Sequence, residues 1–571
     1  MKRNPLRSTL SVPFTFVLAL LLPVAALAAA RDAPAHPPGA AISSAHELAT
    51  QAGLDVIRDG GNAFDAAIAV SSVLSVVEPI SSGIGGGGFF LLHDARTGKD
   101  VFLDAREIAP QAATPEKFLD ADGNLDNDKA RHGPWSAGLP GLPAALVLLA
   151  EDYGKLPLSR TLAPAIRIAG EGFPVYPRLE RGYAGKREVL ERYPGTRALF
   201  LADGDPPKVG EILKQPDLAR TLRLLAEKGF DGFYRGDVAE KLVAGVNAEG
   251  GQWTVAELAD YRVREREPIR FRYKDWDITT APPTSSGGVA LAEILNMAAG
   301  WDLQSLDPAQ RAHILVEAMR RAYRDRTIYL GDPDFTTVPM ARLLSPAYAA
   351  GLRATIHPDK ATPSELLPGH PAPLEDEETT HFSIIDAEGN IVSATQTINL
   401  LYGSGLVPPG TGVILNDEMD DFALKPGTPN AFGVMGFEAN AVEPGKRMLS
   451  SMTPTFMESP TKLAVLGAPG GSRIITEVLL GILAYDDGMT AEQVAALPRF
   501  HHQWLPDKVY VEPDAFDAAT IAKLEAMGHT VEEDGTWGVL NTVSWDKATN
   551  TLEGGADPRN PVGSAAVLPA R

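Results

Sequence analysis

The segment around residue 379 combines residue types that could support nucleophilic chemistry. An acidic stretch, Glu375 to Glu378, runs abruptly into Thr379-Thr-His-Phe-Ser383, which has the pattern of a β-strand. A threonine hydroxyl is a weak nucleophile that needs a base beside it. A β-branched residue that opens a strand is also ordinary strand structure. Taken alone, the segment therefore predicts a loop and a strand, and leaves catalysis open.

Other motifs in the sequence give no cofactor or metal site. The run Gly83-Ile-Gly-Gly-Gly-Gly88 matches G-x-G-x-x-G, but it follows a predicted helix and opens a predicted strand, the reverse of the order in dinucleotide-binding folds. No Walker lysine motif, G-x-S-x-G or H-E-x-x-H occurs. The adjacent His501 and His502 lack partner ligands at metal spacing, so we interpret them as structural. We therefore expect no cofactor and no metal.

Composition excludes two classes of chemistry. The chain of 571 residues has no cysteine, so it contains neither disulfides nor thiolate nucleophiles. Its formal net charge is −21, which argues against nucleic acid or anionic lipid as partners. With 44% apolar residues, the chain is long enough to bury a large core or several domains.

The N-terminus has the pattern of a secretory signal. Lys2, Arg3 and Arg7 precede an apolar run to Leu27, and Ala26 and Ala28 suit signal peptidase. We predict a removable signal over residues 1–28, no stable membrane anchor, and a periplasmic or secreted protein.

Elsewhere the pattern alternates between hairpins and helices. Four strand pairs are predicted, at 89–104, 381–397, 455–467 and 539–552, each around a polar turn. Helices are predicted up to Gly60-Gly61 from a capping box at Ser44 to Glu47, and over 63–77, 308–328 and 474–485. Residues 30–41, rich in Ala and Pro, are expected to form a mobile leader. This order favours an α+β fold in which helices cover antiparallel sheets.

Ten short motifs, in order from about residue 44 to the C-terminus, resemble the γ-glutamyltranspeptidase family. They are Gly60-Gly-Asn-Ala63, Glu78-Pro79 with Ser81-Ser-Gly-Ile-Gly-Gly-Gly-Gly88, Asp104-Ala-Arg-Glu107, Pro283-Thr-Ser-Ser-Gly-Gly288, Tyr329-Leu-Gly-Asp-Pro-Asp-Phe335, Thr379-Thr-His381, Asn416-Asp-Glu-Met-Asp-Asp-Phe422, Leu449-Ser-Ser-Met452, Pro469-Gly-Gly-Ser-Arg473 and Pro498-Arg-Phe-His-His502.

The resemblance implies the N-terminal-nucleophile αββα sandwich, in which two antiparallel sheets lie between helical layers. It also implies an inactive precursor that cuts itself between Glu378 and Thr379. The products would be a large subunit, residues 29–378, and a small subunit, residues 379–571, that associate in one intertwined fold. The new α-amine of Thr379, with a reference pKa near about 7.7 to 8.0, would serve as the base for its own hydroxyl.

The resemblance further implies roles for other residues. Thr397 would support the nucleophile, and Gly470 and Gly471 would donate backbone N–H groups to the oxyanion. The α-carboxylate of a γ-glutamyl substrate would bind Arg106, Ser450 and Ser451, and its α-ammonium would bind Asn399, Glu418 and Asp421. Glutathione is the expected donor, and water, amino acids or peptides are the expected acceptors.

The chain departs from the family pattern at two places. Phe432 stands in the segment 426–440 where many bacterial relatives have a tyrosine whose hydroxyl bonds near the nucleophile, so we hypothesise a lid closed mainly by packing. Leu142 and Pro143 replace the usual small residues after Gly141, with no consequence that we can derive.

Two other functions stay open from the sequence. A cephalosporin acylase of the same superfamily would use the same threonine on a glutaryl group, which lacks the α-ammonium. An acidic pair, Glu418 with Asp421, favours the γ-glutamyl substrate, because unpaired buried carboxylates are costly. A non-catalytic periplasmic binding protein would have no need of Thr379.

Overall fold

The computed structural model describes residues 35–201, 204–366 and 379–570. The predicted signal at 1–28 and the residue before Thr379 lie outside these ranges. Among the described residues, no helix is both long and apolar enough to cross a membrane.

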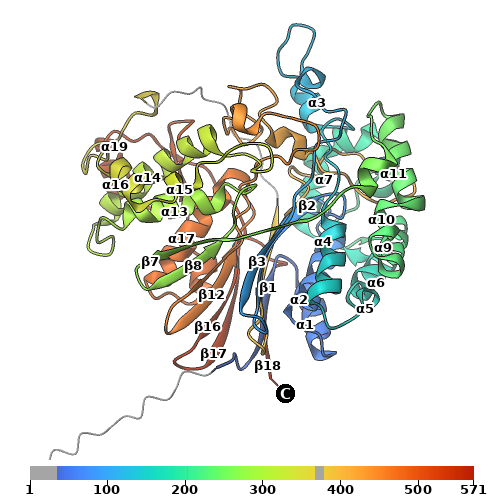
Figure 1. The fold of residues 1–571 in the computed structure, drawn as a ribbon, viewed down its shortest axis with the longest axis horizontal. Coiled ribbons are helices and arrows are strands. Elements are labelled where there is room, and N and C mark those ends of the chain that lie inside the picture. The colour runs from blue at the N-terminus through green and yellow to red at the C-terminus, as the bar shows by residue number, and fades with distance from the viewer. Residues whose placement is uncertain (1–34, 202–203, 367–378, 571) are drawn as a thin grey trace, which may run out of the picture.

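Two antiparallel sheets form the centre of the molecule (Figure 1). In spatial order, the seven-stranded sheet contains β18 (Ser564–Pro569), β1 (Gly39–Ser44), β9 (Thr380–Ile385), β10 (Ile391–Thr397), β2 (Gly87–Asp94), β3 (Lys99–Ala105) and β6 (Arg264–Arg266). The six-stranded sheet contains β17 (Thr551–Ala556), β16 (Asn541–Asp546), β12 (Lys462–Gly467), β11 (Thr455–Glu458), β8 (Trp276–Thr280) and β7 (Ile269–Tyr273). Two small sheets pair β13 (Phe500–His501), β14 (Val509–Val511) and β15 (Val531–Glu533), and β4 (Phe173–Pro174) with β5 (Ile212–Leu213).

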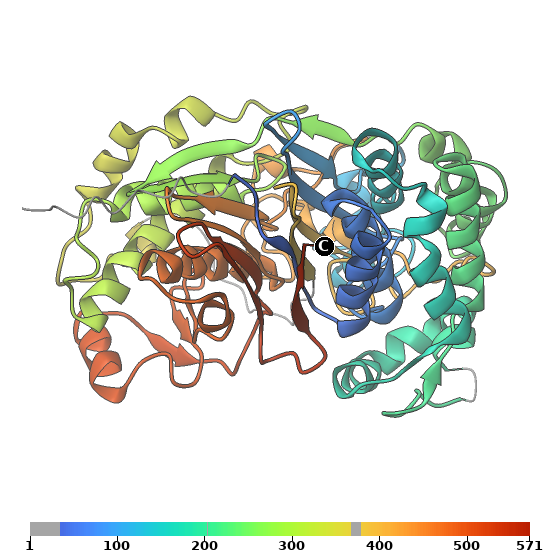
Figure 2. The same ribbon diagram turned by 90° about the horizontal axis from the view of Figure 1, so that it is seen from below.

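Helices cover the outer faces of both sheets (Figures 1 and 2). Beside the seven-stranded sheet lie α1 (Glu47–Arg58), α2 (Ala63–Val77), α4 (Leu142–Leu148), α5 (Leu158–Thr161), α6 (Ala163–Glu171), α7 (Pro177–Arg192), α8 (Pro194–Phe200), α9 (Pro216–Lys228), α10 (Asp231–Tyr234), α11 (Gly236–Ala248) and α12 (Val255–Ala259). Beside the six-stranded sheet lie α13 (Gly287–Ala298), α14 (Pro308–Tyr329), α15 (Met340–Leu343), α16 (Pro346–Arg353), α17 (Ile474–Asp486), α18 (Ala491–Ala495) and α19 (Ala518–Ala526). The short α3 (Asn127–Arg131) lies at one end of the sheets. These four layers confirm the predicted αββα sandwich.

Side-chain alternation explains why the seven-stranded sheet is buried on both faces. Phe90 and Leu92 of β2 belong to the core shared with α1 and α2, whereas Phe89 and Leu91 belong to the core between the sheets. A strand that is apolar at every position is buried on both faces, because successive side chains point to opposite sides. Both cores therefore meet on the same strands.

The four predicted hairpins are confirmed as β2–β3, β9–β10, β11–β12 and β16–β17. The buried helix at 63–77 is confirmed as well, with Asn62 as its N-cap. The capping box at Ser44 is wrong. Ser44 ends strand β1, where its hydroxyl contacts Thr50, and the side chain of His46 caps α1 instead.

The expectation that residues 30–41 form a mobile leader is also wrong for the last residues of this range. Gly39–Ser44 is a buried interior strand that pairs with β18 on one side and β9 on the other. Alanine and glycine are poor strand formers, so local composition gave no sign of this strand. The two neighbouring strands supply its stability through the sheet.

Polar side chains connect the two sheets across the core. The amide of Asn541 on β16 donates to the carbonyl of His381 on β9 at 3.0 Å. The hydroxyl of Ser393 on β10 donates to the carbonyl of Leu466 on β12 at 3.2 Å. Because buried polar groups are costly when unpaired, these bonds favour one relative position of the sheets.

The imidazole of His381 predicts an acid limit to stability. It is fully buried between Thr395 and Ser383, at 2.8 and 3.0 Å, and burial lowers its pKa from 6.5 to about 3. The unfolded chain therefore binds more protons between these pH values. Stability from neutral His381 is present above pH 6.5 and is lost as the pH falls toward 3, by up to about 1.4 kcal/mol per pH unit.

We expect His381→Gln to lose less thermal stability than the wild type when the pH is lowered from about 7 to about 5. The measurement is the midpoint of thermal unfolding at each pH. Exposed His36→Gln is the control and should follow the wild type. Equal losses in His381→Gln and wild type would contradict the prediction.

Candidate active site

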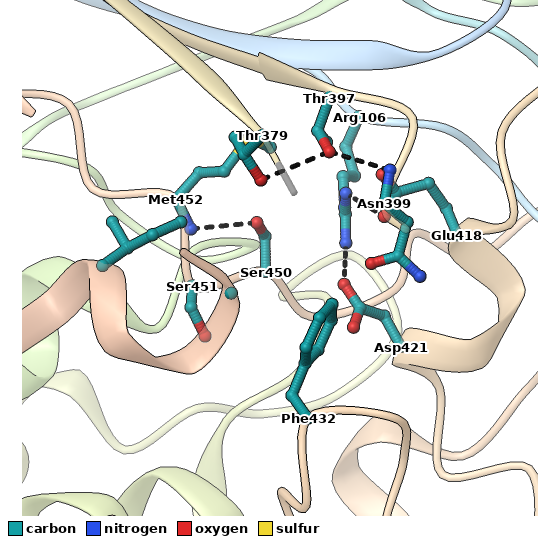
Figure 3. A pocket seen from close by; sticks show the side chains of 12 residues that line it. Arg106, Thr379, Thr397, Asn399, Glu418, Asp421, Phe432, Ser450, Ser451 and Met452 are labelled. Atoms are coloured by element: carbon teal, nitrogen blue, oxygen red, sulfur yellow. Dashed lines mark hydrogen bonds and ion pairs between the residues drawn. The ribbon is translucent and has the colours of Figure 1, made fainter. Parts of the chain in front are cut away.

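Thr379 lies at one end of a pair of central strands. It directly precedes β9, which pairs with β10 so that Thr380 faces Gln396. One residue further along, the hydroxyl of Thr379 donates to the hydroxyl of Thr397, the last residue of β10, at 3.4 Å (Figure 3). The backbone N–H of Asn399 donates to the same Thr397 oxygen at 2.8 Å. Strand register therefore holds these two hydroxyls together.

A small cavity opens beside Thr379. Its walls come from several separate parts of the chain, which meet at the ends of the two sheets (Figure 3). The lining residues are Arg106, Thr379, Thr397, Asn399, Glu418, Asp421, Phe432, Ser450, Ser451, Met452, Gly471 and Ile474. All the site residues predicted from the sequence within the described ranges line this cavity, except Gly470, which precedes the lining residue Gly471.

Arg106 lies just beyond the end of β3 and is 1% exposed. Its guanidinium is ion-paired with Glu418 and with Asp421, and Nε donates to the carbonyl of Met448 at 3.3 Å. Burial opposes the charge, but the surrounding carboxylates, Glu418 foremost, outweigh it and raise the pKa of Arg106. The sequence placed Arg106 and the acids at opposite ends of a substrate, whereas the structure brings them into direct contact.

Glu418 and Asp421 begin and end a single 3-10 turn, Glu418–Asp421. Burial raises the pKa of Glu418 well above its ordinary value and also raises the pKa of Asp421, while Arg106 acts in the opposite direction. Apart from the ion pair with Arg106, neither carboxylate oxygen of Glu418 has a hydrogen-bond partner among the described residues. Free acceptor capacity at a buried carboxylate suits a cationic ligand group.

A third carboxylate, Glu107, stands behind this pair. Its Oε2 lies 3.6 Å from Nη1 of Arg106, and the side chain is fully buried. Burial, partly opposed by Arg106, raises the pKa of Glu107 to about 7. A Cβ on Gly87 would lie 2.7 Å from the Glu107 carboxylate, so that position leaves room only for glycine. The site thus places three carboxyl groups around one guanidinium.

Asn399 and the serine pair complete the polar wall. Asn399 has a positive φ of 79°, and its side-chain amide donates to the carbonyl of Asp417 at 3.1 Å. The hydroxyl of Ser450 accepts from the N–H of Met452 at 3.1 Å. The hydroxyl of Ser451 accepts from Nη2 of Arg326 at 3.0 Å.

Arg326 is a neighbour of the site that the sequence analysis missed. It lies in the last turn of α14, is 7% exposed, and also donates to the hydroxyl of Ser286 at 2.9 Å. Burial lowers its pKa, while the more distant Asp421 acts in the opposite direction. The helix was predicted, but helical spacing alone does not tell that this arginine points inward, toward Ser451.

Gly470 and Gly471 form the turn that leads into α17. Their φ values are +127° and +49°, which L side chains rarely adopt, so both positions need glycine. The turn continues as the 3-10 segment Gly471–Arg473 and then α17. Backbone N–H groups at the start of a helical segment are free to bind negative charge. Gly471 brings this turn to the cavity wall.

Phe432 covers the cavity from the predicted lid segment (Figure 3). The ring is 6% exposed and packs with Leu400, Ala431 and Val434 in a small apolar cluster. Its N–H donates to the side chain of Asn430 at 3.1 Å. The aromatic side chain itself contributes only packing, because it has no hydroxyl.

His501 and His502 lie away from the cavity and are fully buried. His501 contacts Thr476 at 2.9 Å, and His502 contacts Asp507 at 3.2 Å. No group of three or more metal-ligating side chains occurs in the part of the chain that the structure describes.

Comparison with known proteins agrees with this architecture. The family model for gamma-glutamyltranspeptidase matches residues 49–567. The glutathione hydrolase proenzyme of Pseudomonas sp. (strain A14) is 44% identical over 510 residues, 88% of each chain, and that of Escherichia coli (strain K12) is 40% identical over 527 residues, 91% of this chain and 90% of the relative. The crystal structure of a cephalosporin acylase from Bacillus halodurans superposes with a TM-score of 0.83 at 30% identity, covering 99% of this chain and all of that one. The chain therefore belongs to the gamma-glutamyltranspeptidase family.

Proposed function

We propose that this protein is a glutathione hydrolase and γ-glutamyltransferase that matures by cutting its own chain between Glu378 and Thr379. The observation that carries the proposal is the Thr379 hydroxyl beside Thr397, at the wall of a cavity that also contains a buried guanidinium among carboxylates. The two similar glutathione hydrolases are proenzymes, which supports maturation by cleavage.

Cleavage would create the catalyst. The Thr379 hydroxyl attacks the carbonyl of Glu378, and the C–N bond breaks, so that the acyl group moves to the oxygen as an ester and the α-amine of Thr379 is freed. Water then hydrolyses the ester, which releases the Glu378 carboxylate and restores the Thr379 hydroxyl. That amine then accepts the proton of the hydroxyl as the oxygen attacks a γ-glutamyl carbonyl. The N–H groups of Gly470 and Gly471 stabilise the oxyanion, and Thr397 orients the attacking oxygen. The departing amine takes the proton, and water or an acceptor amine then releases the γ-glutamyl group from Thr379.

The charge distribution supports a γ-glutamyl donor such as glutathione. The α-ammonium binds among Glu418, Asp421 and Asn399, where two carboxyl groups face the single guanidinium of Arg106. The α-carboxylate binds Arg106 from the side of Ser450 and Ser451. A glutaryl group would bring the carboxylate without the ammonium and leave the acids uncompensated. The fold alone does not separate the two substrates, because a cephalosporin acylase shares it.

Strand order supports lasting association of the two subunits. In the seven-stranded sheet, β1, β2, β3 and β6 belong to residues 29–378, whereas β18, β9 and β10 belong to residues 379–571. Three pairings, β18–β1, β1–β9 and β10–β2, therefore join the two subunits. Cleavage before Thr379 leaves all of them intact.

The pattern of residues 1–28, basic and then apolar, supports export to the periplasm or beyond, with removal of this segment. N-terminal sequencing of the large subunit from the periplasmic fraction would test this.

Thr379→Ala tests the whole proposal. We expect the wild type to yield a 193-residue fragment that begins at Thr379, and the variant to stay whole and inactive, because no hydroxyl attacks Glu378. Intact mass and N-terminal sequencing are the measurements. Thr380→Val is the matched control, since the buried Thr380 hydroxyl has no hydrogen-bond partner among the described residues. Cleavage of the alanine variant would refute the nucleophile, and an intact wild type would favour a binding protein.

Asp421→Asn tests the ammonium site. We expect kcat/KM for a γ-glutamyl anilide to fall about 10- to 100-fold, the cost of one charge-assisted hydrogen bond, with a much smaller loss for the glutaryl anilide. Asp420→Asn removes the same charge from the same turn, but Asp420 faces Arg131 and does not line the cavity. The preference of this variant for the γ-glutamyl over the glutaryl anilide should therefore equal that of the wild type. Faster glutaryl than γ-glutamyl cleavage by the wild type would support the acylase alternative.

Phe432→Tyr tests the lid. A hydroxyl on this ring would add a polar contact near Thr379 and hold the lid closed more firmly, so the ratio of transfer to hydrolysis should rise. Product ratios with a γ-glutamyl anilide and an acceptor dipeptide measure it. An unchanged ratio would mean that the missing hydroxyl has no effect on water access.

A further inference from the structure

A buried glutamine outside the cavity wall links the lid to the glycine turn. Gln503 follows β13, is 4% exposed, and does not line the cavity. Its Nε2 donates to the carbonyl of Phe432 at 3.0 Å and to the carbonyl of Leu505 at 3.3 Å. Its Oε1 accepts from the hydroxyl of Ser472 at 2.5 Å and contacts Nε2 of His501 at 2.9 Å. All hydrogen-bonding capacity of the amide is used.

These partners determine the orientation of the amide. The two carbonyl oxygens accept only, so the NH₂ group must face Phe432 and Leu505. Oε1 therefore faces Ser472 and His501, and both must donate to it. Burial lowers the pKa of His501 well below its ordinary value, so the ring is neutral. With Oε1 facing it, the ring is assigned the tautomer protonated on Nε2, which leaves Nδ1 as an acceptor toward Thr476. A flipped amide would place an oxygen against two carbonyl oxygens.

The two ends of this amide reach the Phe432 segment and the glycine turn. Phe432 covers the cavity, and because it has no hydroxyl, its backbone carbonyl is the group through which Gln503 holds it. Ser472 directly follows Gly471, and its own carbonyl accepts a hydrogen bond from the hydroxyl of Tyr323 on α14. Ser472 is thus held on both sides, by a helix and by Gln503.

We propose that Gln503 is a positioning residue that couples closure of the Phe432 lid to the placement of the Gly470–Gly471 oxyanion donors. The inference rests on the proposed function, in which those glycines stabilise the oxyanion. With the amide in place, a closed lid and a correctly placed turn support each other. Without it, water enters beneath Phe432 and the turn loses the hydrogen bond at the Ser472 hydroxyl.

Two substitutions remove separately the hydrogen bond from Gln503 to Phe432 and the hydrogen bond from Ser472 to Gln503. Gln503→Glu replaces the donating NH₂ with an oxygen that faces the Phe432 carbonyl, but keeps an acceptor for Ser472. Ser472→Ala removes the hydrogen bond between the glycine turn and Gln503 but leaves the contact of Gln503 with Phe432. Exposed Gln493→Glu makes the same chemical change away from the site and serves as the control. Each variant is checked for cleavage before Thr379, thermal midpoint, and the mass of the γ-glutamyl adduct with a slow donor.

We expect Gln503→Glu to raise KM for a γ-glutamyl anilide about tenfold, the effect of about one buried hydrogen bond, and to lower the ratio of transfer to hydrolysis. We expect Ser472→Ala to lower kcat about tenfold with a smaller change in KM, since a displaced oxyanion donor affects mainly the transition state. In the double variant, the fold-loss of kcat/KM should be smaller than the product of the two single fold-losses, because both substitutions break the same connection between Phe432 and the glycine turn. Gln493→Glu should match the wild type.

Three results would overturn the inference. If the wild type forms no adduct on Thr379, the proposed function fails and the inference fails with it. If the adduct forms in every protein but KM and the transfer ratio of Gln503→Glu stay within about twofold of wild type, only the inference fails. If Gln503→Glu does not mature, Ser472→Ala decides alone, and an unchanged kcat would refute the coupling.

Discussion

Antiparallel pairing of β9 with β10 is the constraint on which the rest of the site depends. The pair lies at the centre of the seven-stranded sheet, with β1 on one side and β2 on the other. Its register brings Thr379 and Thr397 to the same end, where the two hydroxyls meet. Because every neighbouring strand is buried, a shift of one residue would turn apolar side chains toward the wrong core. Thr379 is thus held by many contacts that have no chemical role.

The acidic and basic groups around the cavity form one electrostatic unit. Arg106 would be costly to bury alone, and so would Glu418 or Asp421, but together they offset much of that cost. Glu107 adds a third carboxyl group, and because burial raises its pKa to about 7, it carries only part of a negative charge near neutral pH. A zwitterionic ligand brings both signs at a fixed spacing and can satisfy such a unit from its open side. The same arrangement penalises a ligand that brings only a carboxylate.

The lid and the glycine turn belong to the same packing system. Phe432 covers the site with an apolar ring, and its backbone carbonyl binds the amide of Gln503. Gln503 binds Ser472 in turn, next to the positive-φ glycines. This connection passes through backbone groups and through Gln503, which does not line the cavity. Because the hydrogen bond uses the backbone carbonyl of residue 432, it does not depend on whether the side chain there carries a hydroxyl.

The sequence by itself determined the local elements and indicated which residues are candidates for the chemistry. Alternating apolar residues predicted the four hairpins, and apolar spacing with caps at Asn62 and Asp307 predicted the main helices, because period and capping are local properties. Strand β1 was not predictable, since Gly39–Ser44 gains its stability only from β18 and β9, more than three hundred residues away along the chain. Family motifs indicated Thr379, Arg106, Glu418 and Asp421, but only the tertiary structure decided that the arginine is paired with both acids. Contacts of Arg326 with Ser451 and of Gln503 with Phe432 were equally invisible, because a side chain's partner depends on which distant segments the sheets bring together.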